Sequence, residues 1–374
     1  MSGLYGSRGL TIVSGSGAFV RDGAGKEYLD FYCGSGAALF GHAHPRLREA
    51  LANASGRPWT IGPGMGAEVR DRLKARLNRL LPGRSLFYCN SGTESIEAAL
   101  KLAVALRPER RKILALRRAF HGRTLGALAL TFNPQYRRSW THLLAPVLHV
   151  RPEELPGAVD GDTAAVFVEP IQGEGGVHPL SASLGAAIGA ACARTGALLV
   201  CDEVQCGWGR CGAFSASSLA GLEPDILCFA KGVAGGLPVG LTLWKKELGD
   251  FAPGGHGSTY GGNPLVLAVA EAALGLLEEG TPIAGARSGG EYFRKLLKGI
   301  DSPLIAEVRG MGLLNGVELT VKAAPVIRRM QRNGVLALPA GPSVVRFLPP
   351  FPAVREDFDR AAAVLADALK AEAA

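Results

Sequence analysis

The chain lacks several features that mark particular classes of protein. Among its 374 residues, no apolar run is long enough to cross a membrane, because Arg194 and Glu271 interrupt the longest candidates. The N-terminal residues 1–8 have no apolar core of the kind that a secretory signal carries. Asn and Gln are scarce, as in many heat-adapted proteins. We therefore expect a cytoplasmic protein without a membrane segment.

Cysteine shows no metal-binding pattern. The seven cysteines include Cys201, Cys206 and Cys211 at five-residue intervals, but no CxxC pair or matched histidine accompanies them. We expect no metal site. We expect instead reduced, mostly buried thiols that pack as small hydrophobic groups.

Acidic residues are fewer than basic ones. The chain has 33 Asp and Glu against 41 Lys and Arg, a net charge of +8. Basic residues cluster between Arg70 and Arg79 and between Arg107 and Arg118, with spacings that suit exposed helix faces and ends. A solvated surface explains these clusters, and an acidic partner is the alternative. No nucleic-acid motif accompanies the charge, so we do not expect a nucleic-acid partner.

The remaining composition is typical of a large globular α/β protein, with 47% hydrophobic and 20% charged residues. From about residue 65 to 264, helical and strand patterns alternate, which predicts a mostly parallel sheet covered by helices. Helices are predicted at 67–81, 94–106 and 182–195, and strands near 112–116, 125–131, 164–168, 197–202, 225–229 and 238–243.

The two ends of the chain are predicted to meet in a second unit. Residues 17–31 indicate a hairpin that turns at Asp22 and Gly23. A helix over 265–279 leads to strands predicted at 304–308, 313–319, 335–338 and 344–347 and to a closing helix near 355–372. We expect a large domain over residues 61–264 and a smaller α+β domain made of residues 1–60 and 265–374.

Lys231 stands in a glycine-rich turn, residues 229–236, downstream of a strand that ends at Asp202. A desolvated amine loses its proton more easily and becomes a nucleophile able to form a Schiff base. Residues 197–201 predict a buried strand, after which an unpaired Asp202 would be costly. The protonated ring nitrogen of pyridoxal phosphate (PLP) is a cation that would neutralise it. Taken singly, a surface lysine and a helix-capping Asp explain the two residues as well.

A hydroxyl- and glycine-rich segment, residues 91–93, opens an apolar helix. The free N–H groups and hydroxyls at such a helix start suit a phosphate. Ser91 and Glu94 also fit a capping box, which is a purely structural device. Ser258 and Thr259 lie in a second loop of this kind, which suits either a phosphate or a simple turn.

Phe120 and Arg123 follow a predicted strand. Phe120 could stack on a planar cofactor, and Arg123 could hold a substrate carboxylate as a bidentate fork. The alternative is a core Phe and a surface Arg, and we expect His121 between them to be structural.

Glu169 and Glu174 flank a Pro/Gly turn after another strand. They either solubilise the loop or hold an arginine over a pocket, with Arg346 as the predicted partner.

Together and in this order, these motifs resemble the class III (ornithine and ω-amino acid) aminotransferases. The resemblance runs from about Gly17 to Pro350 and is strongest to the acetylornithine and succinylornithine aminotransferases and their lysine-pathway relatives. It implies the type I PLP-dependent transferase fold, an α/β fold with a large domain, whose mostly parallel sheet is flanked by helices, and a smaller α+β domain. It also implies a homodimer with the active site at the interface.

The resemblance implies a role for each matching residue. Lys231 would be the Schiff-base lysine and proton shuttle, and Asp202 would keep the pyridine nitrogen protonated. Gln205 would lie near the ring hydroxyl, and Thr259 would reach the phosphate of the neighbouring subunit. The full set of implied cofactor-binding residues is Ser91, Gly92, Thr93, Phe120, Asp202, Val204, Gln205, Lys231, Ser258 and Thr259.

The implied substrate contacts are Arg123, Glu174 and Arg346. Arg123 would bind the α-carboxylate in both half-reactions. Glu174 and Arg346 would form a switch, paired when an α-amino group is accommodated and separated when 2-oxoglutarate presents its own carboxylate to Arg346. Such a switch favours a transferase over other PLP chemistry.

The implied activity moves the terminal amino group of an α-N-blocked ornithine or lysine to 2-oxoglutarate, giving a semialdehyde and glutamate in lysine or arginine biosynthesis. The block is either an acetyl group or a small acidic carrier protein, and the positive charge favours the carrier. Alternatives are an ornithine or 4-aminobutyrate aminotransferase, an aminomutase or racemase, and a non-catalytic basic binding protein. The family commonly has Thr where Cys206 and Cys211 stand and Asn in place of Ala38, so the substrate stays open.

Overall fold

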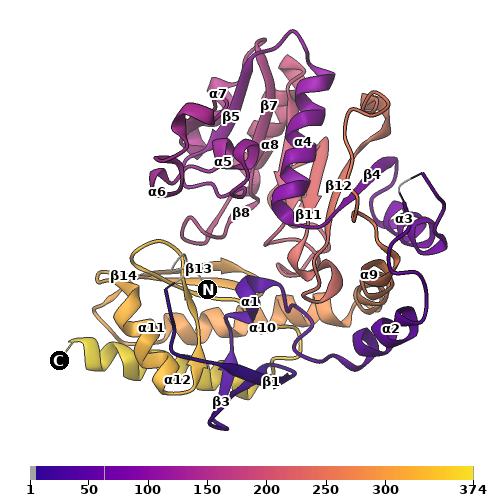
Figure 1. Ribbon diagram of the computed structural model, residues 1–374. Helices are drawn as coiled ribbons and strands as arrows, with labels where there is room; N and C mark the ends of the chain where they lie inside the picture. The colour runs from indigo at the N-terminus through magenta and orange to yellow at the C-terminus, as the bar shows by residue number, and fades with distance from the viewer. Residues whose placement is uncertain (1–5, 63, 374) are drawn as a thin grey trace.

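The computed structural model describes residues 6–62 and 64–373. A seven-stranded sheet forms the centre of the upper lobe (Figure 1). Its strands, in spatial order, are β4 (Arg84–Cys89), β12 (Gly240–Lys245), β11 (Ile226–Phe229), β10 (Leu198–Asp202), β7 (Thr163–Val168), β5 (Lys112–Leu116) and β6 (Leu148–Val150). The run from β11 to β6 is parallel, and only β12 is antiparallel to its neighbours β11 and β4. The predicted mostly parallel sheet is confirmed.

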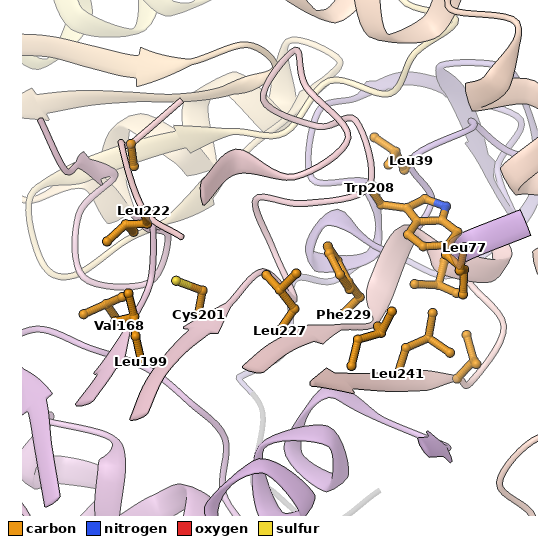
Figure 2. Packing of buried hydrophobic residues seen from close by; sticks show 14 of the residues in the cluster. Leu39, Leu77, Val168, Leu199, Cys201, Trp208, Leu222, Leu227, Phe229 and Leu241 are labelled. Carbon is orange, nitrogen blue, oxygen red and sulfur yellow. The ribbon is translucent and has the colours of Figure 1, made fainter. Parts of the chain in front are cut away.

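The central strands are buried on both faces. Along β10, Leu199 and Cys201 belong to one hydrophobic core, whereas Leu198 and Val200 belong to another. This alternation follows from the two-residue period of a strand, which points successive side chains to opposite faces. Figure 2 shows the first core, where Cys201 and Leu227 lie in a row with Phe229 and Trp208.

Helices cover both faces of this sheet. Helix α4 (Gly92–Leu106) packs Ile96 and Leu102 into one core, and α8 (Ala182–Thr195) packs Ile188 into the other. Helix α3 (Glu68–Leu80) buries Leu73 and Leu77 in the same core as α8. The three helices predicted for this region are confirmed to within a few residues at each end.

The strand predicted near 125–131 is wrong. Residues Leu125–Leu130 form a helix, α5, which is almost wholly buried from Ala127 to Leu130. The segment contains only Leu, Ala and Gly, with no β-branched side chain, and Leu and Ala are among the strongest helix formers. Besides the short helices, the described residues contain three longer helices without a sequence prediction: α2 (Pro45–Ser55), α10 (Thr281–Lys298) and α11 (Ala323–Arg332).

The N- and C-terminal parts of the chain share a second lobe. In one four-stranded sheet β1 (Ile12–Ser16), β2 (Phe19–Asp22) and β3 (Glu27–Asp30) pair with β15 (Val335–Leu336), and in another the order is β13 (Ile305–Met311), β14 (Leu314–Leu319), β17 (Val344–Phe347) and β16 (Leu338–Pro339). Phe31 packs edge-on against Phe293 of α10 and also against Phe358 of α12 (Arg355–Ala373). The first and last segments therefore bury one core together.

Helix α9 (Pro264–Glu278) joins the two lobes. Its Leu267, Ala270 and Leu274 belong to the core of the large sheet, and α2 packs alongside it.

The domain division into residues 1–60, 61–264 and 265–374 stays a prediction. The short elements are α1 (Cys33–Gly36), α6 (Pro134–Arg137), α7 (Leu155–Ala158), β8 (Ile171–Gln172), β9 (His178–Pro179), η1 (Thr141–Leu143), η2 (Pro152–Glu154), η3 (Ala216–Ser218), η4 (Lys231–Ala234) and η5 (Lys246–Leu248).

The cysteines lie inside the protein. All seven are free and buried, and burial raises the pKa of the Cys206 and Cys211 thiols.

In the part of the chain that the structure describes, His, Cys, Asp and Glu side chains form no group that could hold a metal ion. Over the same residues, no helix has both the length and the apolarity needed to span a bilayer.

Candidate active site

A cavity of about 420 Å³ lies where several strands of the large sheet end. Its walls come from segments that follow β4, β5, β7, β10 and β11. The pairing of the sheet makes these five strands run the same way, so their carboxyl ends meet at one edge. Ligand sites of open α/β sheets occur at such edges. The cavity walls include Asn90, Ser91, Gly92, Thr93, Phe120, His121, Gly122, Arg123, Glu169, Asp202, Val204, Gln205 and Lys231.

Lys231 enters this cavity from the turn after β11. Its backbone φ is +43°, in the left-handed region that a residue with a side chain adopts only at a cost of about 1–3 kcal/mol. Enclosure lowers the pKa of the Lys231 amine, against the opposing effect of the Glu174 carboxylate. A larger share of the amine is therefore neutral and nucleophilic than in a lysine surrounded by water.

Asp202 ends β10 and is 5% exposed. One carboxylate oxygen, Oδ2, lies 2.8 Å from Nδ1 of the buried His121, and the other, Oδ1, accepts the Val204 N–H at 3.0 Å. Burial lowers the pKa of His121, but the hydrogen bond to Asp202 and its charge outweigh burial, so the pKa is raised overall. The other ring nitrogen, Nε2, has no hydrogen-bond partner among the described residues.

Glu169 adds a third buried titratable group. Its oxygens accept the backbone N–H groups of Phe120 at 3.0 Å and Gly173 at 3.2 Å. Burial raises the pKa of Glu169 to about 7, and the charge of Asp202 acts in the same direction. Glu169 therefore keeps its proton to a higher pH than an ordinary carboxyl group and adds little negative charge to the site below that pH.

The start of α4 forms one end of the cavity. Ser91, the N-cap residue, accepts the Glu94 N–H at 3.3 Å. The Glu94 carboxylate accepts the N–H of Asn90 at 2.7 Å, one residue before the N-cap, so only one of the two hydrogen bonds of the expected capping box forms. A Cβ on Gly92 would lie 2.6 Å from the Val204 side chain. Only glycine fits against Val204, which leaves the helix start open to a phosphate.

Arg123 lies at the mouth of the cavity and is exposed. Its guanidinium carbon is 4.4 Å from the centre of the Tyr136 ring, and Tyr136 meets Phe120 edge-on at 5.9 Å between ring centres. A cation over an aromatic face is attracted to it. Tyr136 therefore fixes the position of Arg123 relative to the Phe120 wall.

Arg346 reaches toward the site from β17 in the second lobe. Its Nη2 donates to Glu174 Oε1 at 2.7 Å and its Nη1 donates to Gln205 Oε1 at 2.7 Å. The Arg346 side chain is 2% exposed, and its Nε has no partner in the described part of the chain. Burial raises the pKa of Glu174, but Arg346 and Lys231 lower it more.

Ser258 and Thr259 do not line the cavity of this single chain. The Ser258 hydroxyl accepts the Asn90 side-chain N–H at 3.1 Å, and Thr259 is exposed.

The sequence did not indicate the contacts that His121 and Tyr136 make. The place of His121 between Phe120 and Arg123 was a usable signal, whereas Tyr136 lies outside every motif.

The residues present fit PLP. Asp202 is a buried carboxylate that can pair with a ring nitrogen, Lys231 is an amine with a lowered pKa, and a glycine-opened helix start suits the phosphate. On a mostly parallel sheet flanked by helices, this arrangement defines the class of PLP-dependent enzymes with the type I transferase fold.

Comparison with known proteins narrows this class. Residues 5–369 match the family model described as aminotransferase class-III. The solved ornithine aminotransferase of Toxoplasma gondii, in which PLP partially occupies the active site, aligns with a TM-score of 0.93 at 31% identity over 99% of this chain and 92% of its own. The chain belongs to the aminotransferase class-III family and is a PLP-dependent aminotransferase.

Two curated relatives span nearly the whole chain. A transaminase of Sulfurisphaera tokodaii that acts on [LysW]-aminoadipate semialdehyde and glutamate semialdehyde is 41% identical over 96% of this chain and 94% of its own. The acetylornithine aminotransferase of Bacillus subtilis is 36% identical over 98% of this chain and 96% of its own.

Proposed function

We propose that this aminotransferase moves the terminal amino group of an α-N-blocked ornithine or lysine to 2-oxoglutarate, giving a semialdehyde and glutamate. The reaction belongs to lysine or arginine biosynthesis, as the names of the relatives suggest. The observation that carries the proposal is the ion pair of the buried Arg346 with the partly exposed Glu174, near Lys231. Arg346 can bind the second carboxylate of 2-oxoglutarate. When that carboxylate is absent, Glu174 pairs with Arg346, so the buried cation is never left unpaired.

Lys231 and Asp202 carry the chemistry. Bound PLP supplies an electron sink for the substrate carbon that loses its proton. Asp202 would keep the ring nitrogen protonated, and His121 orients the Asp202 carboxylate through the 2.8 Å contact. Lys231 Nζ, with its lowered pKa, would take the proton from the substrate carbon and pass it to the cofactor, and would move a proton in the opposite direction during the second half-reaction.

The rest of the site positions the cofactor. Ser91, Gly92 and Thr93 would bind its phosphate at the start of α4, and Val204 and Phe120 would hold the two faces of its ring. Gln205 would lie near the ring hydroxyl. We assign Ser258 and Thr259 to the phosphate site of the neighbouring subunit of a homodimer, because neither reaches the cavity of its own chain.

Arg123, Glu174 and Arg346 select the substrates. Arg123 holds one substrate carboxylate at the mouth of the cavity in each half-reaction. Arg346 stays paired with Glu174 for the amino donor and releases Glu174 to bind the second carboxylate of 2-oxoglutarate. One pocket can thus accept a basic donor and a dicarboxylate acceptor.

For the blocking group we propose a small acidic amino-group carrier protein in the cytoplasm. Several relatives are named for a [LysW]-linked substrate, among them the transaminases of Sulfurisphaera tokodaii and Deinococcus radiodurans. The net charge of +8 suits an acidic partner, and seven free, buried cysteines suit a reducing compartment.

The proposal is tested by steady-state rates on two amino donors measured side by side with 2-oxoglutarate. One donor is lysine linked to the carrier through its α-amino group, and the other is α-N-acetylornithine. We expect the larger kcat/KM for the carrier-linked donor. A preference for acetylornithine would replace the carrier by an acetyl block, and no activity on either donor would end the proposal.

A further inference from the structure

The stretch of chain around the cavity mouth is free of acidic residues. No Asp or Glu occurs between Glu109 and Glu153, although Arg and Lys recur throughout this stretch. Arg123, Arg137 and Arg138 all fall within it, and none of them forms an ion pair with another described residue. Their charge is therefore not neutralised locally, in contrast to Arg72 and Arg76, which pair with glutamates of α9.

Large apolar side chains are exposed beside these arginines. Trp140 is 49% exposed and Leu143 is 53% exposed. The Trp140 N–H bonds the Arg137 carbonyl, and the Leu143 N–H bonds the Trp140 carbonyl, so the segment after α6 is tightly folded. We call Arg123, Arg137, Arg138, Trp140 and Leu143 the basic face. Exposed aromatic and aliphatic groups beside cations are typical of protein-binding surfaces.

The basic face is joined to the active site through Tyr136. The Tyr136 ring lies under Arg123 and against Phe120, and both of these residues line the cavity. Arg137 and Arg138 follow Tyr136 directly in the chain. A polypeptide whose attached substrate enters the cavity past Arg123 would therefore contact the basic face just outside the cavity.

We propose that the basic face docks an acidic polypeptide that carries the amino substrate into the cavity. This inference rests on the proposed function and adds to it the surface on which the carrier binds. Arg137 and Arg138 attract carboxylates of the carrier, and Trp140 and Leu143 provide apolar contact area. Charges at the edge of an interface act mainly on the rate of association and on its salt dependence. A free acetylated substrate bound in the cavity is too small to contact Arg137, Arg138, Trp140 or Leu143.

The test compares two variants with the wild type. The first is Arg138→Glu combined with Trp140→Ala, which changes two side chains outside the cavity wall. The matched control is Arg328→Glu, the same charge reversal at an exposed position of α11. Each enzyme is assayed with 2-oxoglutarate and either the LysW carrier loaded with lysine through its α-amino group or α-N-acetylornithine.

We expect the double variant to raise KM for the carrier-linked donor about tenfold, with kcat/KM for acetylornithine within about twofold of wild type as evidence of an intact site. The control should match the wild type on both donors. Raising NaCl from about 0.05 to 0.5 M should raise KM for the carrier in the wild type more than in the double variant.

Each other outcome overturns the inference in a distinguishable way. An unchanged KM for the carrier in the double variant would remove the docking surface and leave the proposed function in place. A wild type that uses acetylornithine but not the carrier would remove both the carrier and its docking surface. If polyuridylic acid instead binds the wild type and fails to bind the double variant, the occupant is a nucleic acid and the inference is wrong.

Discussion

The guanidinium of Arg123 rests on the ring of Tyr136, 4.4 Å from its centre. The two residues belong to different segments, the loop after β5 and the short helix α6. Cation–π contacts at partly exposed sites contribute roughly 0.5–2 kcal/mol. The arginine proposed to bind the substrate carboxylate is thus positioned by a residue that lies outside the cavity wall.

Replacing Tyr136 tests this positioning. Tyr136→Leu removes the aromatic face, and we expect KM for both the amino donor and 2-oxoglutarate to rise about three- to tenfold with kcat nearly unchanged. Tyr136→Phe keeps the face and should retain the wild-type KM. Steady-state kinetics on the three enzymes decides the point, because equal losses in the Phe and Leu variants would assign the effect to the hydroxyl or to general packing.

Gly92 should tolerate no side chain. In Gly92→Ala the new methyl would lie 2.6 Å from the Val204 side chain, which must shift at the phosphate end of the cavity. We expect the dissociation constant for PLP, measured by absorbance titration of the cofactor-free protein, to rise at least about tenfold, or 1.4 kcal/mol. The control Gly189→Ala, on α8 with open space around it, should bind PLP as the wild type does. Unchanged affinity in Gly92→Ala would place the phosphate elsewhere.

Arg346 should matter for one half-reaction only. With Arg346→Met, the 2-oxoglutarate half-reaction loses the partner of its second carboxylate, and we expect its kcat/KM to fall about 100-fold, the effect of a charge-assisted hydrogen bond of roughly 3 kcal/mol. The amino-donor half-reaction should change much less. Single-turnover absorbance changes measure each half-reaction separately. A similar loss in both would mean that Arg346 is needed for the shape of the site and does not act as a switch.

Glu169 predicts a pH dependence of stability. Its pKa is raised in the folded protein from 4.5 to about 7, so the folded state binds more protons than the unfolded state between these values. The stabilising effect of that proton is present below pH 4.5 and is lost as the pH rises to 7. The raised pKa of the neighbouring His121 acts in the same direction.

Relative to Glu169→Gln, the wild-type protein without cofactor should therefore lose on the order of 1–3 kcal/mol of unfolding free energy across this window. Urea unfolding of both proteins at a series of pH values measures the difference. Parallel curves for wild type and variant would show that Glu169 titrates normally.

The sequence predicted the parts of the site that depend on local chemistry. Asp202 and Lys231 were identified because a buried strand end and a glycine-rich turn limit what their side chains can do, and the chain brings both to one cavity. The partner chosen for Glu174 was Arg346, and the two do form an ion pair although 171 residues separate them in the chain. The mostly parallel sheet followed from the alternation of helical and strand patterns.

Other features depend on tertiary packing and were not predictable in the same way. The segment Leu125–Leu130 is apolar throughout, so its pattern did not separate a short buried helix from a strand. Helix α10 contains several glycines and gave no clear helical signal. The contact of Tyr136 with Arg123 joins the short helix α6 to the loop after β5, and no periodicity in the sequence relates the two. His121 acquires its role only because Asp202 faces it.

The most direct test of the account is the turnover of Lys231→Ala with an amino donor and 2-oxoglutarate. Because Lys231 is the group assigned both to bind the cofactor and to move the proton, we predict that kcat falls by about 10⁴-fold or more. A variant that folds, takes up PLP and keeps its turnover within about tenfold of wild type would contradict the central claim.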